Sequence, residues 1–255
     1  MAVAACTAPG SGGNVAATTP AELTVFGAAS LADVLGKVKA AYEAAHPGLT
    51  IVIATDSSAA LATQIEQGAP ADVFLSADTE NAQRLVLDGF AAGDAVAFAD
   101  NELAIIVPTG NPAGIATAVD LARPGLKIVA AGAAVPITRY AVQLVANLAR
   151  QPGYPSEFAR DYEANVVSRE DNVKAVVAKI ELGEGDAGIV YRTDALASSK
   201  VGLVDVPAGA NVVARYAGVV IQDTGEPAAA AAFLDWLTSP DGQSILASFG
   251  FRSPS

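Results

Sequence analysis

LTVFGAASLADVL, residues Leu23–Leu35, is the stretch that decides the fold. A β-branched and aromatic run, residues 24–26, meets the small residues Gly27-Ala28-Ala29, and after Ser30 the apolar residues recur at helical spacing. This order predicts a strand, a tight bend and a helix with Ser30 as its N-cap. The first turn of a helix leaves N–H groups unpaired and carries about half a positive charge, so it favours a small anion. A lone serine N-cap is usually only structural, so a ligand site requires further helix starts of the same kind.

The same unit recurs along the chain. Residues 49–55, LTIVIAT, form a predicted buried strand that runs into Asp56, Ser57 and Ser58 before another helical pattern. Two more helix starts are predicted, one at Pro136 and one after residues 169–172. Further strands are predicted at residues 71–75, 101–108, 126–131, 165–168, 189–191, 203–206 and 215–221, with a turn at 109–112 as a crossing point and two helices over 227–249.

Alternation of strands and helices predicts an α/β fold with a mostly parallel sheet covered on both faces. Ligands of such sheets bind beyond the carboxyl ends of the strands. The predicted strand ends bring Ser30, Ser58, Ile137 and Tyr191 to that edge. The repeated helix starts therefore predict an anion site there.

Composition and charge exclude several classes of function. The 255 residues are 52% hydrophobic, which suffices for a large core, but no apolar run approaches the ~20 residues that span a bilayer. We therefore expect no part of the mature chain to cross the membrane. A net charge of −12 argues against nucleic acid as a partner. A local anion site remains compatible with this charge, because helix dipoles act over one turn and distant charges are screened within about 8 Å.

An enzyme is the competing class. A serine hydrolase needs a base beside its nucleophile, yet His46 is the only histidine, in a helix-end Ala-His-Pro-Gly context, and no G-x-S-x-G occurs. The sequence also lacks a cysteine and histidine cluster for a transition metal. We therefore predict a binding protein and no enzyme, with no cofactor. A lipoprotein acting through protein contacts alone is a further alternative, which the repeated helix starts disfavour.

The single cysteine lies at the end of Val3-Ala4-Ala5-Cys6, which resembles a bacterial lipobox. Residues 7–20 are small, polar and contain glycine and proline, as a flexible tether requires. We expect Cys6 to be lipidated, so that an extracytoplasmic protein touches the membrane only through its lipid anchor. The alternative is an ordinary unstructured N-terminus that contains a stray cysteine.

Five motifs occur in an informative order: FGAASL (26–31), SSAALATQIEQGAPADVFLSAD (57–78), VPITRYA (135–141), REDNV (169–173) and LGEGDAGIVYRTDA (182–195). Together they resemble the periplasmic molybdate-binding proteins of ABC importers, over nearly the whole chain after the tether. The resemblance implies a two-lobed type II periplasmic-binding-protein fold, each lobe a mostly parallel sheet flanked by helices, with the ligand cleft between the lobes. The expected organisation is a signal remnant and tether over 1–21, lobe I over 22–104 and 216–255, and lobe II over 105–215.

The resemblance also implies a set of ligand-binding residues. They contact the oxygens of molybdate through side-chain hydroxyls or backbone N–H groups: Ser30, Ser57, Ser58, Ile137, Val173 and Tyr191. From the residues alone, Tyr191 is interpreted as a core tyrosine with its hydroxyl at the surface, and Arg139 and Arg192 as either solvated or paired in salt bridges on the lobe surface. This chain departs from the family at Ile137, where a small residue is common, and at Asp56, whose carboxylate would repel a dianion if it pointed into the cleft.

The chemistry of the ligand agrees with this set. Molybdate and tungstate are fully deprotonated dianions near neutral pH, so a site made only of donors suits them, whereas phosphate brings a proton that needs an acceptor. Each charge-assisted hydrogen bond contributes roughly 1.5 to 3 kcal/mol. Sulfate, phosphate and other small anions stay open as alternatives. The implied partners are an ABC permease and its ATPase, and we expect a monomer.

Overall fold

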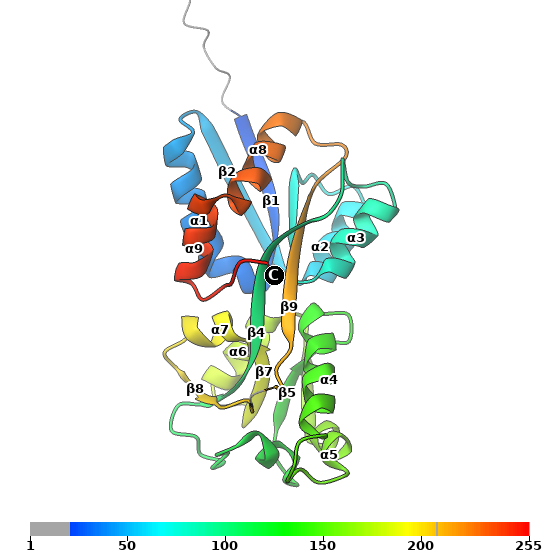
Figure 1. The fold of residues 1–255 in the computed structure, drawn as a ribbon, viewed down its shortest axis with the longest axis vertical. Helices are drawn as coiled ribbons and strands as arrows, with labels where there is room; N and C mark the ends of the chain where they lie inside the picture. Colours follow the sequence, from blue (N-terminus) through cyan, green and yellow to red (C-terminus); the bar gives the residue numbers. More distant parts are fainter. Residues whose placement is uncertain (1–20, 208, 255) are drawn as a thin grey trace, which may run out of the picture.

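The computed structural model describes residues 21–207 and 209–254 and has two lobes, one above the other in Figure 1. Cys6 and nearly all of the expected tether lie outside the described residues. In the upper lobe, lobe I, the elements are β1 (Ala21–Ala28), the 3-10 turn η1 (Ala29–Leu31), α1 (Ala32–Ala45), β2 (Leu49–Asp56), α2 (Ser58–Glu66), β3 (Val73–Ser76), α3 (Thr79–Leu87), α8 (Pro227–Thr238) and α9 (Pro240–Ser248).

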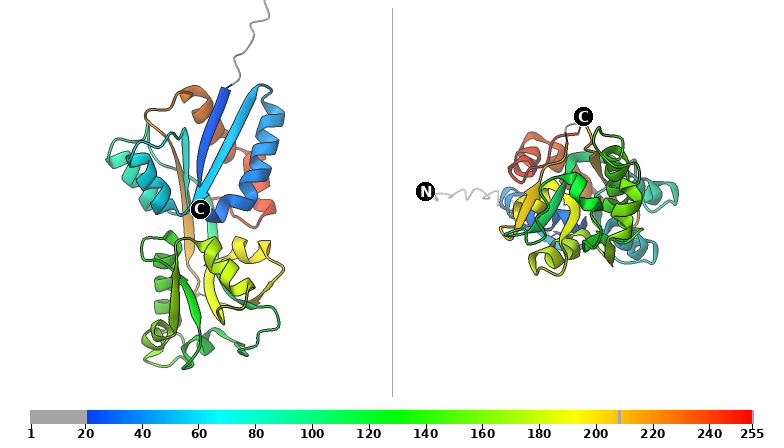
Figure 2. Two further views of the ribbon diagram at one scale, coloured as in Figure 1. Left: turned by 180° about the vertical axis from the view of Figure 1, so that it is seen from behind. Right: turned by 90° about the horizontal axis from the view of Figure 1, so that it is seen from below.

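The lower lobe, lobe II, is built from the middle of the chain (Figures 1 and 2). Its elements are the 3-10 turn η2 (Ala118–Ala122), β5 (Ile128–Ala131), α4 (Pro136–Leu148), α5 (Phe158–Ala164), β6 (Val166–Glu170), α6 (Val173–Glu181), β7 (Ala187–Tyr191), α7 (Arg192–Ala197) and β8 (Val201–Val204). Of these, α5, α7 and η2 were not predicted. The sequence around α5 and η2 is rich in the turn formers proline and glycine. No helix in residues 21–207 and 209–254 is long and apolar enough to cross a membrane.

Two long strands, β4 (Val96–Pro108) and β9 (Val213–Val220), connect the lobes. Residues 96–102 of β4 pair antiparallel with β9, whereas residues 103–108 pair with β7 and β8. The chain therefore crosses between lobes within a continuous strand. The prediction that it crosses at the turn 109–112 is wrong, because that turn follows the end of β4 in lobe II.

The sheet runs in the order β2-β1-β3-β9-β4-β7-β5-β6, with β8 on β4. Parallel pairs form the body of each lobe: β1 with β2 and β3 in lobe I, and β5 with β6 and β7 in lobe II. The strands that join the lobes pair antiparallel with their neighbours. The parallel strands therefore end together, on the side of each lobe that faces the other lobe.

Helices cover both faces of the lobe I sheet, so its central strands are buried on both sides. On one face, α2 and α3 place Leu61, Ile65 and Leu85 against Phe74 of β3. On the other face, α1, α8 and α9 pack against the sheet, where Tyr42 contacts Phe233 edge-to-face at 5.1 Å. Each of these fully buried side chains stabilises the fold by roughly 1.5 to 3 kcal/mol, which keeps the strand ends in fixed positions.

Candidate functional site

A small cavity lies where the strand ends of the two lobes meet. Its empty space of about 190 Å³ includes a part that is open to solvent. Its lining includes five of the six residues that the sequence predicts: Ser30, Ser57, Ser58, Val173 and Tyr191. The other lining residues are Ala28, Ala29, Ala77, Val135 and Pro136, so the walls carry no charged side chain.

The sixth predicted residue, Ile137, takes a different position. Its side chain lines a separate pocket beneath α4, whereas the preceding residues Val135 and Pro136 line the cavity. Pro136 is the first residue of α4 and Ile137 the second, so the Ile137 N–H has no partner within the helix. A bulky side chain is compatible with this position, because Ile137 does not line the cavity.

Ser30 is not the N-cap of a helix, contrary to the prediction. It lies inside the 3-10 turn η1, and no side chain caps either η1 or α1. The small residues Ala28 and Ala29 let the chain tighten into this turn before α1 begins, which brings Ser30 to the cavity. The Ser30 hydroxyl is buried and lies 2.8 Å from the Tyr216 hydroxyl of β9.

The serine pair at the start of α2 uses its oxygens as acceptors. Ser57 is the N-cap, and its Oγ accepts a hydrogen bond from the Ala60 N–H at 3.3 Å. Ser58 Oγ accepts from the Ala77 N–H at 3.0 Å. A hydroxyl has one proton to donate besides its acceptor lone pairs, so both serines keep that proton for another partner.

Val173 is the first residue of α6, whose N-cap is Asn172. The Asn172 side chain accepts from the Ala175 N–H at 3.1 Å. Because Val173 is the first helical residue, its N–H has no intrahelical partner. The N-terminal ends of α2, α4 and α6 thus meet at the cavity, two from lobe II and one from lobe I. Their dipoles give it a positive potential without any charged residue.

Tyr191 ends β7, and only 1% of its surface is exposed. Its hydroxyl has no hydrogen-bond partner among the residues that the structure describes. The ring packs edge-to-face on Tyr216 at 5.5 Å and on Tyr140 at 6.4 Å. Burial raises the pKa of Tyr191 well above its ordinary value, so the phenol stays protonated and can act only as a neutral hydrogen-bond donor or acceptor.

Asp56 does not line the cavity. Its Oδ1 accepts from the Ser57 N–H at 2.7 Å and from Asn172 Nδ2, in the other lobe, at 3.3 Å. The carboxylate is thereby engaged at a contact between the lobes, and the departure from the family at this position does not put an acceptor into the cavity.

Two cations that follow cavity-lining residues closely in the sequence are paired with carboxylates. Arg139 of α4 forms ion pairs with Asp78 and Glu80 of lobe I. Lys174, the residue after Val173, pairs with Asp33 of lobe I. All three ion pairs join the two lobes. The predicted surface salt bridge of Arg139 is therefore found, and it lies between the lobes.

Lys174 also contacts a buried carboxylate of its own lobe. The distance from Lys174 Nζ to Asp194 Oδ1 is 3.1 Å. Burial raises the pKa of Asp194 to about 6, against the opposing effect of the Lys174 ammonium. Across residues 21–207 and 209–254, no group of histidine, cysteine, aspartate or glutamate side chains could hold a metal ion.

The sequence prediction missed Tyr216, the residue in contact with Ser30. Tyr216 is fully buried and 186 positions away from Ser30 in the chain. Its strand was predicted over residues 215–221, but periodicity identifies only a buried face and no partner at such a separation. Residues 30 and 216 meet because β9 lies between β3 and β4 in the sheet.

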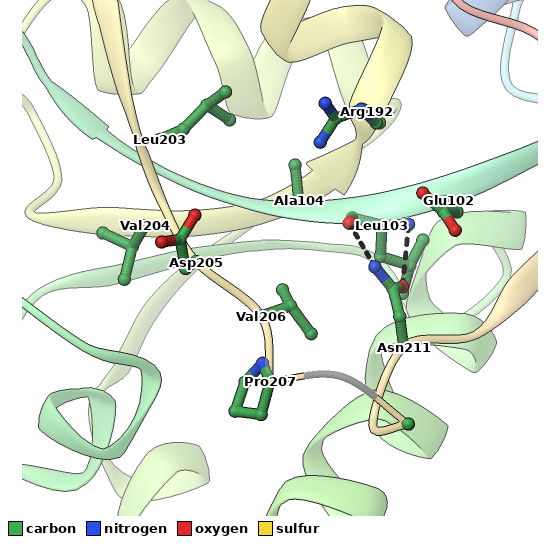
Figure 3. A pocket seen from close by; sticks show the side chains of 11 residues that line it. Glu102, Leu103, Ala104, Arg192, Leu203, Val204, Asp205, Val206, Pro207 and Asn211 are labelled. Carbon is green, nitrogen blue, oxygen red and sulfur yellow. Dashed lines mark hydrogen bonds between the residues drawn. The ribbon is translucent and has the colours of Figure 1, made fainter.

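A wider pocket on lobe II has a different character (Figure 3). The carboxylates of Glu102 and Asp205 line it, together with Arg192. Asn211 bonds both the N–H and the carbonyl of Leu103 across it, at 3.1 and 3.0 Å. With two carboxylates against one guanidinium, this pocket disfavours a dianion, whereas no charged side chain lines the cavity between the lobes.

Comparisons with known proteins agree with this geometry. Residues 23–252 match the model of the family described as bacterial extracellular solute-binding protein. The molybdate-binding protein ModA of Mycobacterium tuberculosis is 37% identical over 251 residues, which cover 95% of this chain and 92% of that protein.

Two solved structures are similar as well. The substrate-binding domain of a putative molybdenum ABC transporter from Clostridium difficile has a TM-score of 0.68 at 26% identity, covering 92% of this chain and all of that one. The sulfate-binding protein SubI from Mycobacterium tuberculosis has a TM-score of 0.80 at 21% identity, covering 91% and 87%, a likeness that concerns the fold alone. The two-lobed fold, the cavity between the lobes and these matches lead to one conclusion: the chain belongs to the bacterial extracellular solute-binding protein family.

Proposed function

We propose that this protein captures molybdate or tungstate outside the cytoplasm and delivers it to the permease of an ABC importer, without catalysing a reaction. The observation that carries the proposal is the Tyr191 hydroxyl, which is buried at the cavity and has no partner among the described residues. An unpaired buried hydroxyl costs about 1 to 3 kcal/mol, and an anion bound in the cavity would remove that cost.

The proposed ligand contacts are the hydroxyls of Ser30, Ser57, Ser58 and Tyr191 and the N–H groups of Ile137 and Val173. The Ser57 and Ser58 oxygens already accept backbone N–H groups, so these serines offer protons to the ligand. No carboxylate lines the cavity to accept a proton from hydrogen phosphate. A fully deprotonated tetrahedral dianion therefore fits the donor set best.

The preference for molybdate over sulfate in this proposal comes from sequence similarity and not from the fold. The ModA protein that is 37% identical carries molybdate in its name, whereas the SubI likeness concerns the fold alone. Sulfate has the same charge and shape with shorter bonds, so discrimination between the two would rest on cavity size. The binding experiment must therefore distinguish sulfate binding from molybdate binding.

Capture would proceed by closure of the lobes around the anion. The proposed moving units are residues 22–104 with 216–255, and residues 105–215. Both boundaries fall within the strands β4 and β9 that join the lobes, which are the natural place for a hinge. The ion pairs of Arg139 with Glu80 and of Lys174 with Asp33, and the Asn172–Asp56 hydrogen bond, would form on closure and hold the closed state.

The location of the protein follows from the same proposal. The family description is of extracellular proteins, and a lipid on Cys6 would tether the domain beside the permease through residues 7–20. More than one acyl chain is needed for stable anchoring, as bacterial lipoproteins have. We propose that the domain works as a monomer, since each chain carries a whole site.

A thermal-shift series with the full chain tests the proposal. Molybdate, tungstate, sulfate and phosphate are added at equal concentration. A ligand at 100 times its Kd stabilises the folded state by about 2.7 kcal/mol, so we expect clear shifts with molybdate and tungstate alone. An equal shift with sulfate or phosphate would contradict molybdate as the selected ligand. No shift with any of the four anions would overturn an oxyanion-binding role.

A further inference from the structure

A chain of buried hydrogen bonds runs behind the cavity through both strands that join the lobes. Asn101 of β4 donates from Nδ2 to Thr193 Oγ1 at 2.9 Å and to the Tyr216 hydroxyl at 3.4 Å. The Tyr216 hydroxyl in turn lies 2.8 Å from Ser30 Oγ. All four side chains are at most 5% exposed, and of the four only Ser30 lines the cavity.

The orientation of the Asn101 side chain determines which group donates in each of these hydrogen bonds. Asn101 Oδ1 accepts from the Glu102 N–H at 2.9 Å, which fixes the orientation of the carboxamide and directs its NH₂ group to Thr193 and Tyr216. The Tyr216 oxygen therefore accepts from Asn101. Its own proton needs an acceptor, because the side chain is fully buried.

Ser30 Oγ is the acceptor within reach of that proton. Once Ser30 accepts from Tyr216, its own proton is left to point into the cavity. Burial raises the pKa of Tyr216 well above its ordinary value, so the phenol keeps the proton that it donates.

We propose that Tyr216 is a positioning residue that fixes Ser30 as a hydrogen-bond donor, and that this makes the site selective for fully deprotonated oxyanions over anions that carry a proton. The inference rests on the proposed function and deepens it. Without the Tyr216 hydroxyl, Ser30 can rotate and present a lone pair to the ligand. A dianion such as molybdate then loses a donor, whereas hydrogen phosphate gains an acceptor for its proton.

A double-mutant cycle tests this. Molybdate and phosphate affinities are measured by calorimetry at neutral pH for the wild type, Tyr216→Phe, Ser30→Ala and the double variant. The phenylalanine ring keeps the edge-to-face contacts of Tyr216 with Phe98 and Phe251, so the fold should persist. Tyr42→Phe is the matched control, since it removes a hydroxyl from a buried tyrosine that packs against Phe233 and Trp236 and does not line the cavity.

We expect Tyr216→Phe to weaken molybdate binding by about tenfold, which corresponds to about 1.4 kcal/mol, because the anion loses a fixed donor. In the Ser30→Ala background the same change should have less than about a twofold effect, because Tyr216 acts through Ser30. The ratio of molybdate to phosphate affinity should fall in Tyr216→Phe and stay unchanged in Tyr42→Phe.

Additive effects of the two substitutions, or an unchanged molybdate to phosphate ratio in Tyr216→Phe, would overturn the inference. If Tyr216→Phe does not fold, Asn101→Asp carries the same test, because a carboxylate there draws the Tyr216 proton away from Ser30 and should give the same loss of discrimination. Wild-type protein that fails to bind molybdate would instead contradict the proposed function. The two failures are therefore distinguishable.

Discussion

Asp56 Oδ1 accepts a hydrogen bond from Asn172 Nδ2 at 3.3 Å, so the one acidic side chain next to the serine pair is engaged by the other lobe. The same oxygen accepts from the Ser57 N–H. Both hydrogen bonds go to the same oxygen, and residue 56 does not line the cavity. This contact explains how an acidic residue can stand directly before Ser57 and Ser58 in an anion site.

The first prediction concerns this carboxylate. We expect Asp56→Asn to leave molybdate affinity within about threefold of wild type and phosphate affinity as weak as in the wild type, because residue 56 does not line the cavity and asparagine can still accept a hydrogen bond. Calorimetry with both anions measures this. A gain of phosphate binding in the variant would place residue 56 in the site.

The second prediction concerns the ion pairs between the lobes. Arg139→Gln should weaken molybdate binding by up to about fivefold, because the pairs with Asp78 and Glu80 join the lobes and partly exposed pairs contribute up to about 1 kcal/mol. The matched control is Arg160→Gln, whose partners Glu157 and Asp161 lie in the same lobe as the arginine. Equal affinities of both variants and the wild type would exclude a role for Arg139 in closure.

The third prediction concerns pH. Burial raises the pKa of Asp194 to about 6, above its value near 4 in the unfolded chain, so the folded state binds more protons between these pH values. The contribution of this group to the free energy of unfolding therefore falls by up to about 3 kcal/mol as pH rises from 4 to 6.

Asp194→Asn isolates this contribution, because asparagine does not titrate. Urea unfolding at pH 4, 5, 6 and 7 should show that the variant gains stability relative to the wild type as the pH rises. A constant difference between the two proteins across this range would mean that Asp194 has an ordinary pKa.

The fourth prediction compares two glycines. A Cβ at Gly242 would lie 2.5 Å from the carbonyl oxygens of Trp236 and Leu237, where α9 begins directly after α8, so Gly242→Ala should destabilise the fold by about 1 to 3 kcal/mol. Gly36 lies inside α1 with nothing within 4 Å of such a Cβ, so Gly36→Ala should stabilise it by about 0.5 to 1 kcal/mol. Thermal melts of the two variants check the signs, and the same sign for both would contradict the packing described here.

The sequence predicted the alternation of strands and helices because apolar periodicity and small-residue bends are local signals. It therefore predicted the strands that lead to Ser30, Ser58 and Tyr191. Five of the six residues predicted as ligand contacts line one cavity.

Features that depend on distant parts of the chain were not predictable in the same way. The crossing within β4 depends on which strands pair with each half of it, and the turn at 109–112 is a stronger local signal than that pairing. The Tyr216–Ser30 contact and the orientation of Asp56 also join residues that are more than 100 positions apart. No periodicity in the sequence reports such contacts.

The most direct test of the central claim is calorimetric titration of molybdate into the wild type and into the double variant Ser58→Ala with Tyr191→Phe. We predict at least a tenfold loss of affinity, because two donors to the anion are removed. Loss of the Ser58 oxygen also leaves the Ala77 N–H unpaired, so folding is checked by melting without ligand. A folded double variant with unchanged molybdate affinity would contradict the assignment of this cavity as the binding site.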